Sequence, residues 1–401
     1  MSDQKKITIG LFGFGCVGQG LYDVLNHSQV LEATIAKICV KDRHKQRRLP
    51  MEMFTYDKED ILKRDNLDVV VELIDDADEA YRIVSTAIRK GVNVVTANKK
   101  MLAEHFEELY HLSLKYGVAL LYEGSAGGSI PIIRNLEEYY DNELLDSVEG
   151  IVNGSSNYIL TRMERDNLGY PEALNLAKDK GFAETDPWLD VAGYDSKYKL
   201  LLLTVHAFGL VLKPEQILNL GIQNVTFDDI RYARQRDSRI KLVAKAHKQG
   251  DKVRAYVLPH FVERGRTLYN IMDEYNAVEV EGAYSDRQTL AGKGAGSYPT
   301  GSAVLSDISA LTYGYKYEHK KLRKALKNGS HSPETQLDTD FELKVYVRYV
   351  NRAHLDAIDI ISIEEEYRSP SFNYVVGTVR FASLFHLFGD KTQGLFVCVV
   401  G

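Results

Sequence analysis

A glycine-rich turn near the start of the chain places the strongest constraint on its fold. Residues 7–12 form an apolar, partly β-branched run, which predicts a buried strand. The turn that follows it reads Gly13-Phe14-Gly15-Cys16-Val17-Gly18. In this G-x-G-x-x-G spacing the glycines permit a tight turn and close packing of a helix on the strand. Strand and helix patterns then alternate to about residue 122, which predicts an α/β fold with a Rossmann-type, doubly wound parallel sheet.

The glycine turn is also a candidate dinucleotide site. A helix N-terminus at this turn would offer free N–H groups and a favourable dipole to a pyrophosphate. After the second predicted strand, Asp42 lies where a carboxylate holds the ribose 2′-hydroxyl of NAD, but Arg43 and further basic residues flank it. Because an arginine there accommodates the 2′-phosphate of NADP, the sequence favours NADP over NAD. The alternative is a turn without a ligand beside a solvated loop of mixed charge.

Composition argues against several classes of protein. The chain has 401 residues, 44% of them hydrophobic, so it can bury an ample core in two or three domains. A net charge of -6 argues against nucleic acid and anionic membranes as partners. Three scattered cysteines are too few for a disulfide framework or a zinc site, and no apolar run reaches membrane-spanning length. We therefore expect a cytoplasmic protein.

The pattern of elements predicts four parts. Residues 1–130 form the Rossmann-type domain, and residues 131–317, with mixed helix and strand patterns, form an α+β domain. Part of 300–320 is a candidate to pack back on the first domain. Residues 318–339 contain Pro333 and lack periodicity, so we expect a linker. Residues 340–401 predict a small strand-rich module.

A charged loop ahead of an apolar helix is the strongest candidate site. Residues 184–199 contain four carboxylates and two lysines, and Pro187 and Gly193 interrupt the segment. Charge beside a core must be paired or hydrated, so such a loop is more often a site than a scaffold. Asp195 and Lys199 are four residues apart and share a helix face, and Glu184 precedes them in the loop. The alternative is a surface ion pair of little energetic value.

Two further segments are weaker candidates. Residues Thr96 to Lys99 lie at the carboxyl end of a predicted strand, the edge at which doubly wound sheets bind ligands. The alternative is that Lys99 is a surface lysine near the start of a helix. Glu123 precedes a glycine-rich loop that could present carbonyl oxygens to a hard cation, or that could be a plain connection.

Together these motifs resemble homoserine dehydrogenase. The family's signature matches this chain at Ala177, Gly181, Phe182, Ala183, Asp186, Pro187, Asp190, Val191, Gly193, Asp195 and Lys199. Residues 13–18, 96–99, 153–160 and 294–300 also look like motifs of the family. The resemblance extends over roughly residues 7 to 315.

The resemblance implies an NAD(P)-dependent oxidoreductase that interconverts L-homoserine and L-aspartate 4-semialdehyde, in the biosynthesis of threonine and methionine. It implies that Lys199 is the general acid/base, with Lys99 as a second catalytic lysine, and that residues 131–317 are a catalytic domain that forms a homodimer. The implied substrate-binding residues are Glu184, Asp195 and Gly181. The implied cofactor-binding residues are Gly13, Phe14, Gly15, Cys16, Val17, Gly18, Arg43, Thr96, Lys99 and Gly296. A sodium ion is implied at the backbone of Glu123, Ala126, Gly128 and Ile130.

The chain departs from the family in two places. Asp75 and Asp76 stand where many relatives have glycines. Residues 340–401 are short for a regulatory ACT domain and lack its usual glycine-bearing turn, so we expect a degenerate ACT-like module and do not expect inhibition by threonine. Two rival interpretations are a related oxidoreductase of another amino acid and a nucleotide-sensing regulator without catalysis. Aspartate-semialdehyde dehydrogenase needs a cysteine nucleophile, which none of the three cysteines is placed to supply.

Overall fold

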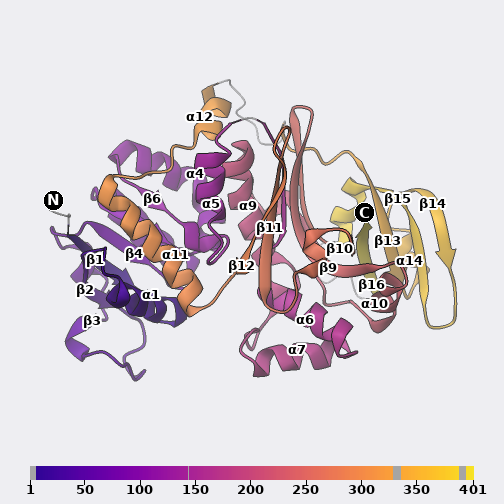
Figure 1. Cartoon of the computed structure of the whole chain (residues 1–401), viewed down its shortest axis with the longest axis horizontal. Helices are drawn as coiled ribbons and strands as arrows, with labels where there is room; N and C mark the ends of the chain where they lie inside the picture. The colour runs from indigo at the N-terminus through magenta and orange to yellow at the C-terminus, as the bar shows by residue number, and fades with distance from the viewer. Residues whose placement is uncertain (1–5, 143, 328–335, 388–393) are drawn as a thin grey trace. The chain divides into compact units, whose positions relative to one another are not determined.

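The structure, a computed structural model, describes residues 6–142, 144–327, 336–387 and 394–401 (Figure 1). The chain divides into two compact units, each with its own sheet. The first unit comprises Met1–Asp141 and Lys293–Lys320, and the second comprises Asn142–Gly292 and Lys321–Gly401.

The first unit contains a six-stranded, fully parallel sheet in the order β3-β2-β1-β4-β5-β6. Its strands are β1 (Ile7–Phe12), β2 (Ala33–Cys39), β3 (Phe54–Thr55), β4 (Val69–Glu72), β5 (Asn93–Thr96) and β6 (Leu120–Leu121). The helices between them are α1 (Cys16–His27), η1 (Met51–Met53), α2 (Glu59–Leu62), α3 (Ala77–Arg89) and α4 (Lys99–Tyr116). This strand order is that of a Rossmann fold and confirms the predicted doubly wound sheet. The Asp76 carboxylate accepts a hydrogen bond from the Glu79 amide at 3.0 Å and so caps α3.

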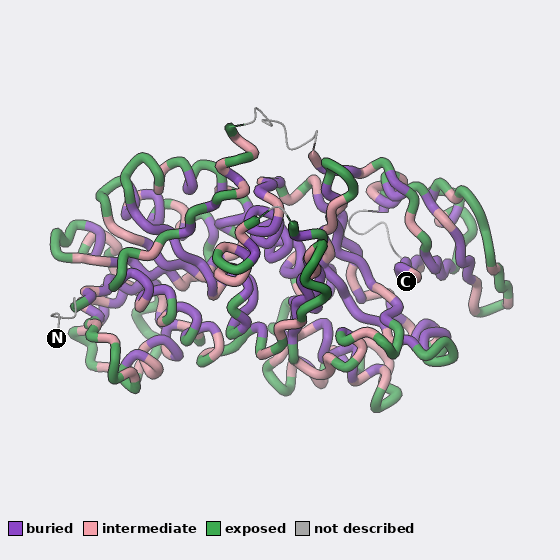
Figure 2. The backbone as a smooth tube through the Cα atoms, turned by 45° about the horizontal axis from the view of Figure 1, so that its top comes forward, coloured by how far each residue is buried: buried purple, intermediate pink, exposed green. Residues whose placement is uncertain are grey.

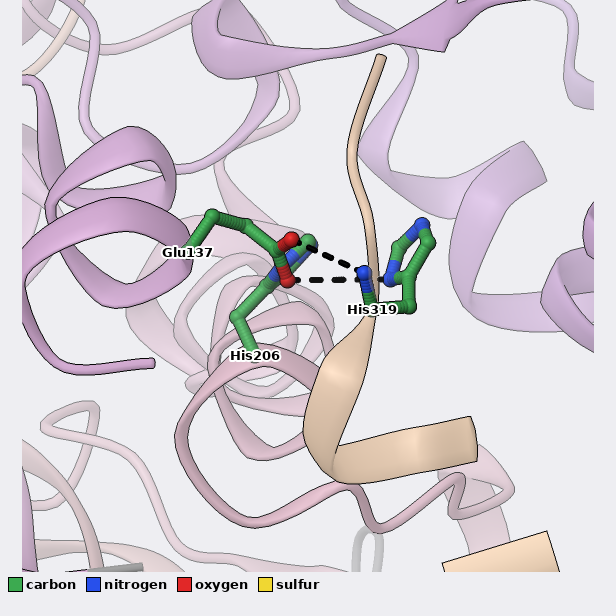
Figure 3. Close-up of side chains that lie close together, drawn as sticks. All are labelled: Glu137, His206 and His319. Atoms are coloured by element: carbon green, nitrogen blue, oxygen red, sulfur yellow. Dashed lines mark hydrogen bonds and ion pairs between the residues drawn. The ribbon is translucent and has the colours of Figure 1, made fainter. Parts of the chain in front are cut away.

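A segment far along the chain completes the first unit. The helix α11 (Ser297–Ala310) packs closely against α1, since a Cβ at Gly20 would lie 2.1 Å from the Ser297 carbonyl oxygen. The turn η6 (Leu311–Tyr313) follows it. Further on, the backbone N–H of His319 donates to Glu137 at 3.0 Å, and the two buried side chains approach one another (Figure 3). Glu137 lies in the π-helix η3 (Asn135–Tyr139), which directly continues α5 (Ile132–Arg134), and the short 3-10 helix η2 (Glu123–Ser125) precedes both.

The second unit contains one large mixed sheet. Along its main path the order is β12-β11-β7-β9-β10-β16-β13-β15-β14, and β8 pairs with β10. The strands before residue 300 are β7 (Leu145–Ile151), β8 (Leu218–Asn219), β9 (Ser238–Gln249), β10 (Lys252–Glu263), β11 (Tyr275–Gly282) and β12 (Asp286–Lys293). The helices are α6 (Gly154–Arg165), α7 (Tyr170–Asp179), α8 (Trp188–Val191), α9 (Tyr194–Phe208), η4 (Pro214–Gln216), α10 (Phe227–Arg234), η5 (Thr267–Asn270) and α12 (Lys320–Lys327). The helix α9 is buried along nearly its whole length, so it forms a core element rather than a surface helix.

The C-terminal part of the second unit is a βαββαβ arrangement. Its elements are β13 (Glu342–Tyr349), α14 (Arg352–Leu355), β14 (Ile360–Tyr367), β15 (Asn373–Arg380), η7 (Phe381–Leu387) and β16 (Leu395–Val400). The order β16-β13-β15-β14 is that of a split βαβ fold. The last strand, β16, pairs in parallel with β10, so this module extends the sheet of the same unit. The edge strand β14 is largely exposed (Figure 2).

The structure differs from the sequence predictions in several elements. The basic end of the predicted linker forms α12, whose Leu322 is buried and whose Lys321 ammonium donates to the His206 carbonyl oxygen at 2.9 Å. Residues 328–335 of that linker lie outside the described residues. The last strand of the alternating pattern that the sequence predicts up to about residue 122 is β6, which is only two residues long. The edge strand β14 was not predicted.

Candidate active site

The two residues that the sequence places on one helix face form a buried ion pair. The helix α9 begins after Gly193, which adopts a left-handed conformation with φ of 84°. Lys199 Nζ lies 2.8 Å from Asp195 Oδ2, and the two side chains are 7% and 8% exposed. The predicted shared face is thereby confirmed, and the surface ion pair is excluded. Their catalytic roles stay predictions.

A backbone carbonyl also fixes the position of the Lys199 ammonium. Lys199 Nζ donates to the carbonyl oxygen of Val152 at 2.6 Å. Val152 follows the last residue of β7, so the lysine links the end of a central strand to the first turns of α9. An ammonium carries three donors and no acceptor, which suits it to a site where oxygen atoms converge.

The structure adds two residues that the sequence analysis did not single out. The Asn153 side-chain amide donates to Asp190 Oδ1 at 2.7 Å and to Asp195 Oδ2 at 2.9 Å. Its own oxygen accepts the Ser156 amide at 2.8 Å and caps α6. Both Asn153 and Asp190 lie in motifs that were recognised, but only the tertiary fold brings these motifs together.

The other predicted substrate residues lie in the loop between α7 and α8. Gly181 follows the end of α7 with φ of 75°, a conformation that favours glycine. Glu184 is exposed, and among the described residues no hydrogen bond or ion pair joins it to Asp195 or Lys199. The sequence grouped Glu184 with these two residues on spacing alone, and the structure brings together only Asp195 and Lys199.

The glycine turn in the first unit has the shape that a pyrophosphate requires. Gly13 has φ of 94°, and a Cβ at Gly18 would lie 2.4 Å from the Gly13 carbonyl oxygen. The N-cap of α1 is Gly15, which has no side chain to occupy the N–H groups of the first turn. Phe14 is buried and contacts Phe54 edge-on, while Cys16 is exposed. The turn, which also includes Val17, therefore fits a dinucleotide phosphate group.

The carboxyl ends of β4 and β5 are tied together beside this turn. The Thr96 hydroxyl donates to Glu72 at 2.5 Å, and burial raises the pKa of Glu72 to about 7. Asn98 caps α4 through the Met101 amide at 3.0 Å, and its amide group donates to the Ile74 carbonyl oxygen at 3.0 Å. Lys99 is the first residue of α4 and is half-buried. These bonds fix the backbone that presents Lys99.

The loop after β2 carries the basic residues that bear on the cofactor. Asp42 is exposed, and hydrogen bonds from the His44 and Lys45 amides lower the pKa of its carboxyl. Arg48 pairs with Asp23 at 2.6 Å. The Arg43 guanidinium lies 5.0 Å from the centre of the Tyr56 ring. Gly296 has φ of 123° just before α11, and the hydroxyl of the next residue, Ser297, donates to the Cys16 carbonyl oxygen of the glycine turn at 2.7 Å.

Two buried acids lie at the predicted cation loop. Glu123 is 3% exposed, and its carboxylate accepts the Ile133 and Arg134 amides at 2.9 and 2.8 Å. Asp307, which is fully buried, accepts the Glu123 amide at 2.9 Å and pairs with Arg134 at 2.8 Å. Burial and the nearby Asp307 raise the pKa of Glu123 to about 8. Gly128 has φ of 56°, and the Ile130 amide donates to the Gly127 carbonyl oxygen at 2.9 Å.

The helices that the structure describes include none that is both long enough and apolar enough to cross a membrane.

Comparison with known proteins identifies the family. A profile described as "Homoserine dehydrogenase, NAD binding domain" matches residues 13–123, and one described as "Homoserine dehydrogenase" matches residues 131–309. Homoserine dehydrogenase from Bacillus subtilis (strain 168) is 35% identical over 77% of this chain and 73% of that protein. The crystal structure of a homoserine dehydrogenase from Thiobacillus denitrificans has a TM-score of 0.81 at 27% identity, and covers 99% of this chain and 98% of that one. The S. aureus homoserine dehydrogenase at pH 6.5 has a TM-score of 0.74 at 30% identity, with 99% of both chains covered. The chain therefore belongs to the homoserine dehydrogenase family and is an NAD-binding oxidoreductase of amino-acid biosynthesis.

Proposed function

We propose that Lys199 moves the proton of the substrate hydroxyl and that Asp195 and Glu184 bind the substrate ammonium group. The substrate is L-homoserine in one direction and L-aspartate 4-semialdehyde in the other. Gly181 and Lys99 complete the proposed set of substrate and catalytic residues. The observation that carries this proposal is the buried pair of Lys199 and Asp195, 2.8 Å apart.

The chemistry of the reaction matches these side chains. Oxidation of a primary alcohol removes a proton from its oxygen and a hydride from its carbon. NAD(P), when bound, accepts the hydride. In its neutral amine form Lys199 can accept the hydroxyl proton, and in its ammonium form it can return that proton and stabilise the negative oxygen that develops during reduction. Carboxylates are the groups that a substrate ammonium requires.

We propose NADP as the preferred cofactor, held by the glycine turn, with Arg43 at its 2′-phosphate. The 2′-phosphate carries negative charge, and Arg43 lies on the exposed loop after β2 with its guanidinium against Tyr56. Thr96, Lys99 and Gly296 are the other proposed cofactor residues. An Arg43→Ser variant should weaken NADPH binding about tenfold or more and leave NADH binding nearly unchanged, as measured by quenching of protein fluorescence. Equal weakening for both cofactors would contradict the assignment to the 2′-phosphate.

A sodium ion bound by the backbone of Glu123, Ala126, Gly128 and Ile130 is a further proposal. The carbonyl oxygens of Glu123 and Ile130 each accept one backbone hydrogen bond, which leaves each a second lone pair. A cation beside two buried acids would also reduce their mutual repulsion. Replacing Na⁺ by a bulky organic cation at constant ionic strength should then lower the thermal stability, and no change would count against the site.

We also propose that the second unit forms a homodimer and that the protein is cytoplasmic. We further propose that the product feeds threonine and methionine biosynthesis. Sedimentation velocity tests the dimer directly.

One assay separates this proposal from its rivals. Initial rates are measured with L-homoserine and either NADP⁺ or NAD⁺, with and without threonine and Na⁺. The proposal expects turnover with L-homoserine and no inhibition by threonine. Cofactor binding without turnover on L-homoserine would instead favour a nucleotide-sensing regulator, and turnover on a different amino alcohol would favour a related oxidoreductase.

A further inference from the structure

Two carboxylates near Lys199 accept hydrogen bonds from the same side chain. Asp190 lies in α8, shortly before the start of α9, and Asp195 lies in the first turn of α9. Asp190 Oδ1 and Asp195 Oδ2 are both bonded to the Asn153 side-chain nitrogen, at 2.7 and 2.9 Å. Neighbouring carboxylates repel one another, so this arrangement needs a donor group between them.

An asparagine amide suits this position better than any other small side chain. Its NH₂ group carries two hydrogens that diverge in one plane, so it can bond two acceptors at a fixed separation. Its oxygen is used at the same time, because it accepts the Ser156 amide at 2.8 Å and caps α6. A serine could cap the helix but has a single hydrogen to donate, and an aspartate would add a third negative charge.

The surrounding backbone holds both ends of this bridge in place. The Asn219 amide group donates to the Ala192 carbonyl oxygen at 2.7 Å, and the Ile222 amide donates to the Val191 carbonyl oxygen at 2.8 Å. The turn between Asp190 and Asp195 is therefore anchored to the segment around β8. Asn153 itself directly follows Val152, whose carbonyl oxygen accepts a hydrogen bond from Lys199.

We infer that Asn153 is a positioning residue of the active site: its amide bridges Asp190 and Asp195 and so fixes the carboxylate that holds Lys199. Asp195 Oδ2 receives both the Asn153 amide and the Lys199 ammonium. Loss of the amide lets the Asp195 carboxylate rotate, and the lysine nitrogen then leaves its place beside the substrate oxygen. The inference rests on the proposed role of Lys199 and adds a residue that acts through it.

Two variants of Asn153 separate a positioning role from a purely structural one. Asn153→Ser keeps a helix cap and removes the bridge, whereas Asn153→Asp keeps the shape and the cap and adds negative charge. Asn351→Ser is the matched control, because Asn351 also caps a helix through its side chain, accepting the Ala353 amide at 3.0 Å, and lies in the C-terminal module. All three are compared with the wild type in kcat, in KM for L-homoserine, in the pH profile of kcat and in melting temperature.

We expect Asn153→Ser to lower kcat about tenfold to a hundredfold with unchanged NADPH binding, and to lower the melting temperature more than Asn351→Ser does, because Asp190 and Asp195 lose their shared donor. In Asn153→Asp a third negative charge stands beside Asp190 and Asp195, so the pH profile of kcat should shift upward. Asn351→Ser should leave kcat and its pH profile unchanged.

Three results would overturn the inference. One is an unchanged kcat and pH profile in both Asn153 variants of an active enzyme. Another is a loss of activity that parallels a loss of folded protein, with normal kcat per folded molecule and a normal pH profile. A wild-type chain that does not oxidise L-homoserine would overturn the proposed function and this inference together, whereas the first two results leave the proposed function standing.

Discussion

Acid should weaken the second unit through one buried carboxylate. Glu149 lies in β7, the strand that leads to Val152 and Asn153, and its side chain is 5% exposed. Lys245 lies 3.2 Å from it, and Arg266 pairs with both Glu149 and Glu279. Burial alone would raise the pKa of Glu149, but the positive charges of Lys245 and Arg266 outweigh it and lower the pKa to about 2.

The size and sign of the effect follow from linkage. A carboxyl whose pKa falls from 4.5 in the unfolded chain to about 2 in the folded chain stabilises the fold by about 3 kcal/mol at neutral pH. Because the folded pKa is the lower one, this stabilisation is present above about pH 4.5 and is lost as the pH falls towards 2. By pH 3 about 2 kcal/mol should be gone, at roughly 1.4 kcal/mol per pH unit.

Urea unfolding of the wild type and of Glu149→Gln from pH 3 to pH 7 tests this. The variant lacks the titrating group and leaves the partly exposed Lys245 and Arg266 without this carboxylate, although Arg266 keeps its pair with Glu279, so it should be less stable at pH 7 by about 3 kcal/mol. The difference between the two proteins should shrink by about 2 kcal/mol at pH 3. Glu263→Gln, at the exposed end of β10, is the control and should show neither effect. A difference between wild type and Glu149→Gln that stays constant with pH would refute the reasoning.

Two further perturbations test the cofactor turn and the core. A Cβ at Gly15 meets no atom within 4 Å, whereas one at Gly18 lies 2.4 Å from the Gly13 carbonyl oxygen. Gly15→Ala should therefore weaken NADPH binding without changing the melting temperature, while Gly18→Ala should also destabilise the fold by about 1 to 3 kcal/mol; equal melting temperatures would contradict this. Lys241 is 1% exposed and donates to Asn157 Oδ1 at 2.9 Å and to the Ile271 carbonyl oxygen. Lys241→Met leaves Asn157 Oδ1 without this donor, while the Ile271 carbonyl oxygen keeps the Asn157 amide at 3.2 Å, so the variant should lose about 1 to 3 kcal/mol of stability in urea unfolding at pH 7. A variant as stable as the wild type would contradict this.

The first unit could be predicted well because its signals are local. The strand over residues 7–12 has the predicted limits, and the glycine spacing requires the turn that Gly13 adopts with φ of 94°. The shared face of Asp195 and Lys199 also follows from helix geometry alone. Asp75 and Asp76 stand where many relatives have glycines. For Asp76 there is a local explanation, because its carboxylate caps α3.

The remaining elements depend on contacts that no local pattern contains. The helix α12 is amphipathic and buries Leu322, but its many lysines make the segment resemble a charged loop in the sequence. The strand β14 lies at the edge of its sheet and carries three consecutive glutamates, so it shows neither a continuous apolar run nor clean alternation. Asn153 and Asp190 are 37 residues apart, and only the fold makes them neighbours.

The most direct test of the account is the turnover of Lys199→Ala on L-homoserine. General acid/base catalysis contributes about a hundredfold to ten-thousandfold, so kcat should fall by that range while NADPH binding to the first unit remains at its wild-type affinity. Lys180→Ala, at the exposed end of α7, should match the wild type in both measurements. A Lys199→Ala enzyme that turns over L-homoserine at the wild-type rate would contradict the claim that this buried lysine moves the substrate proton.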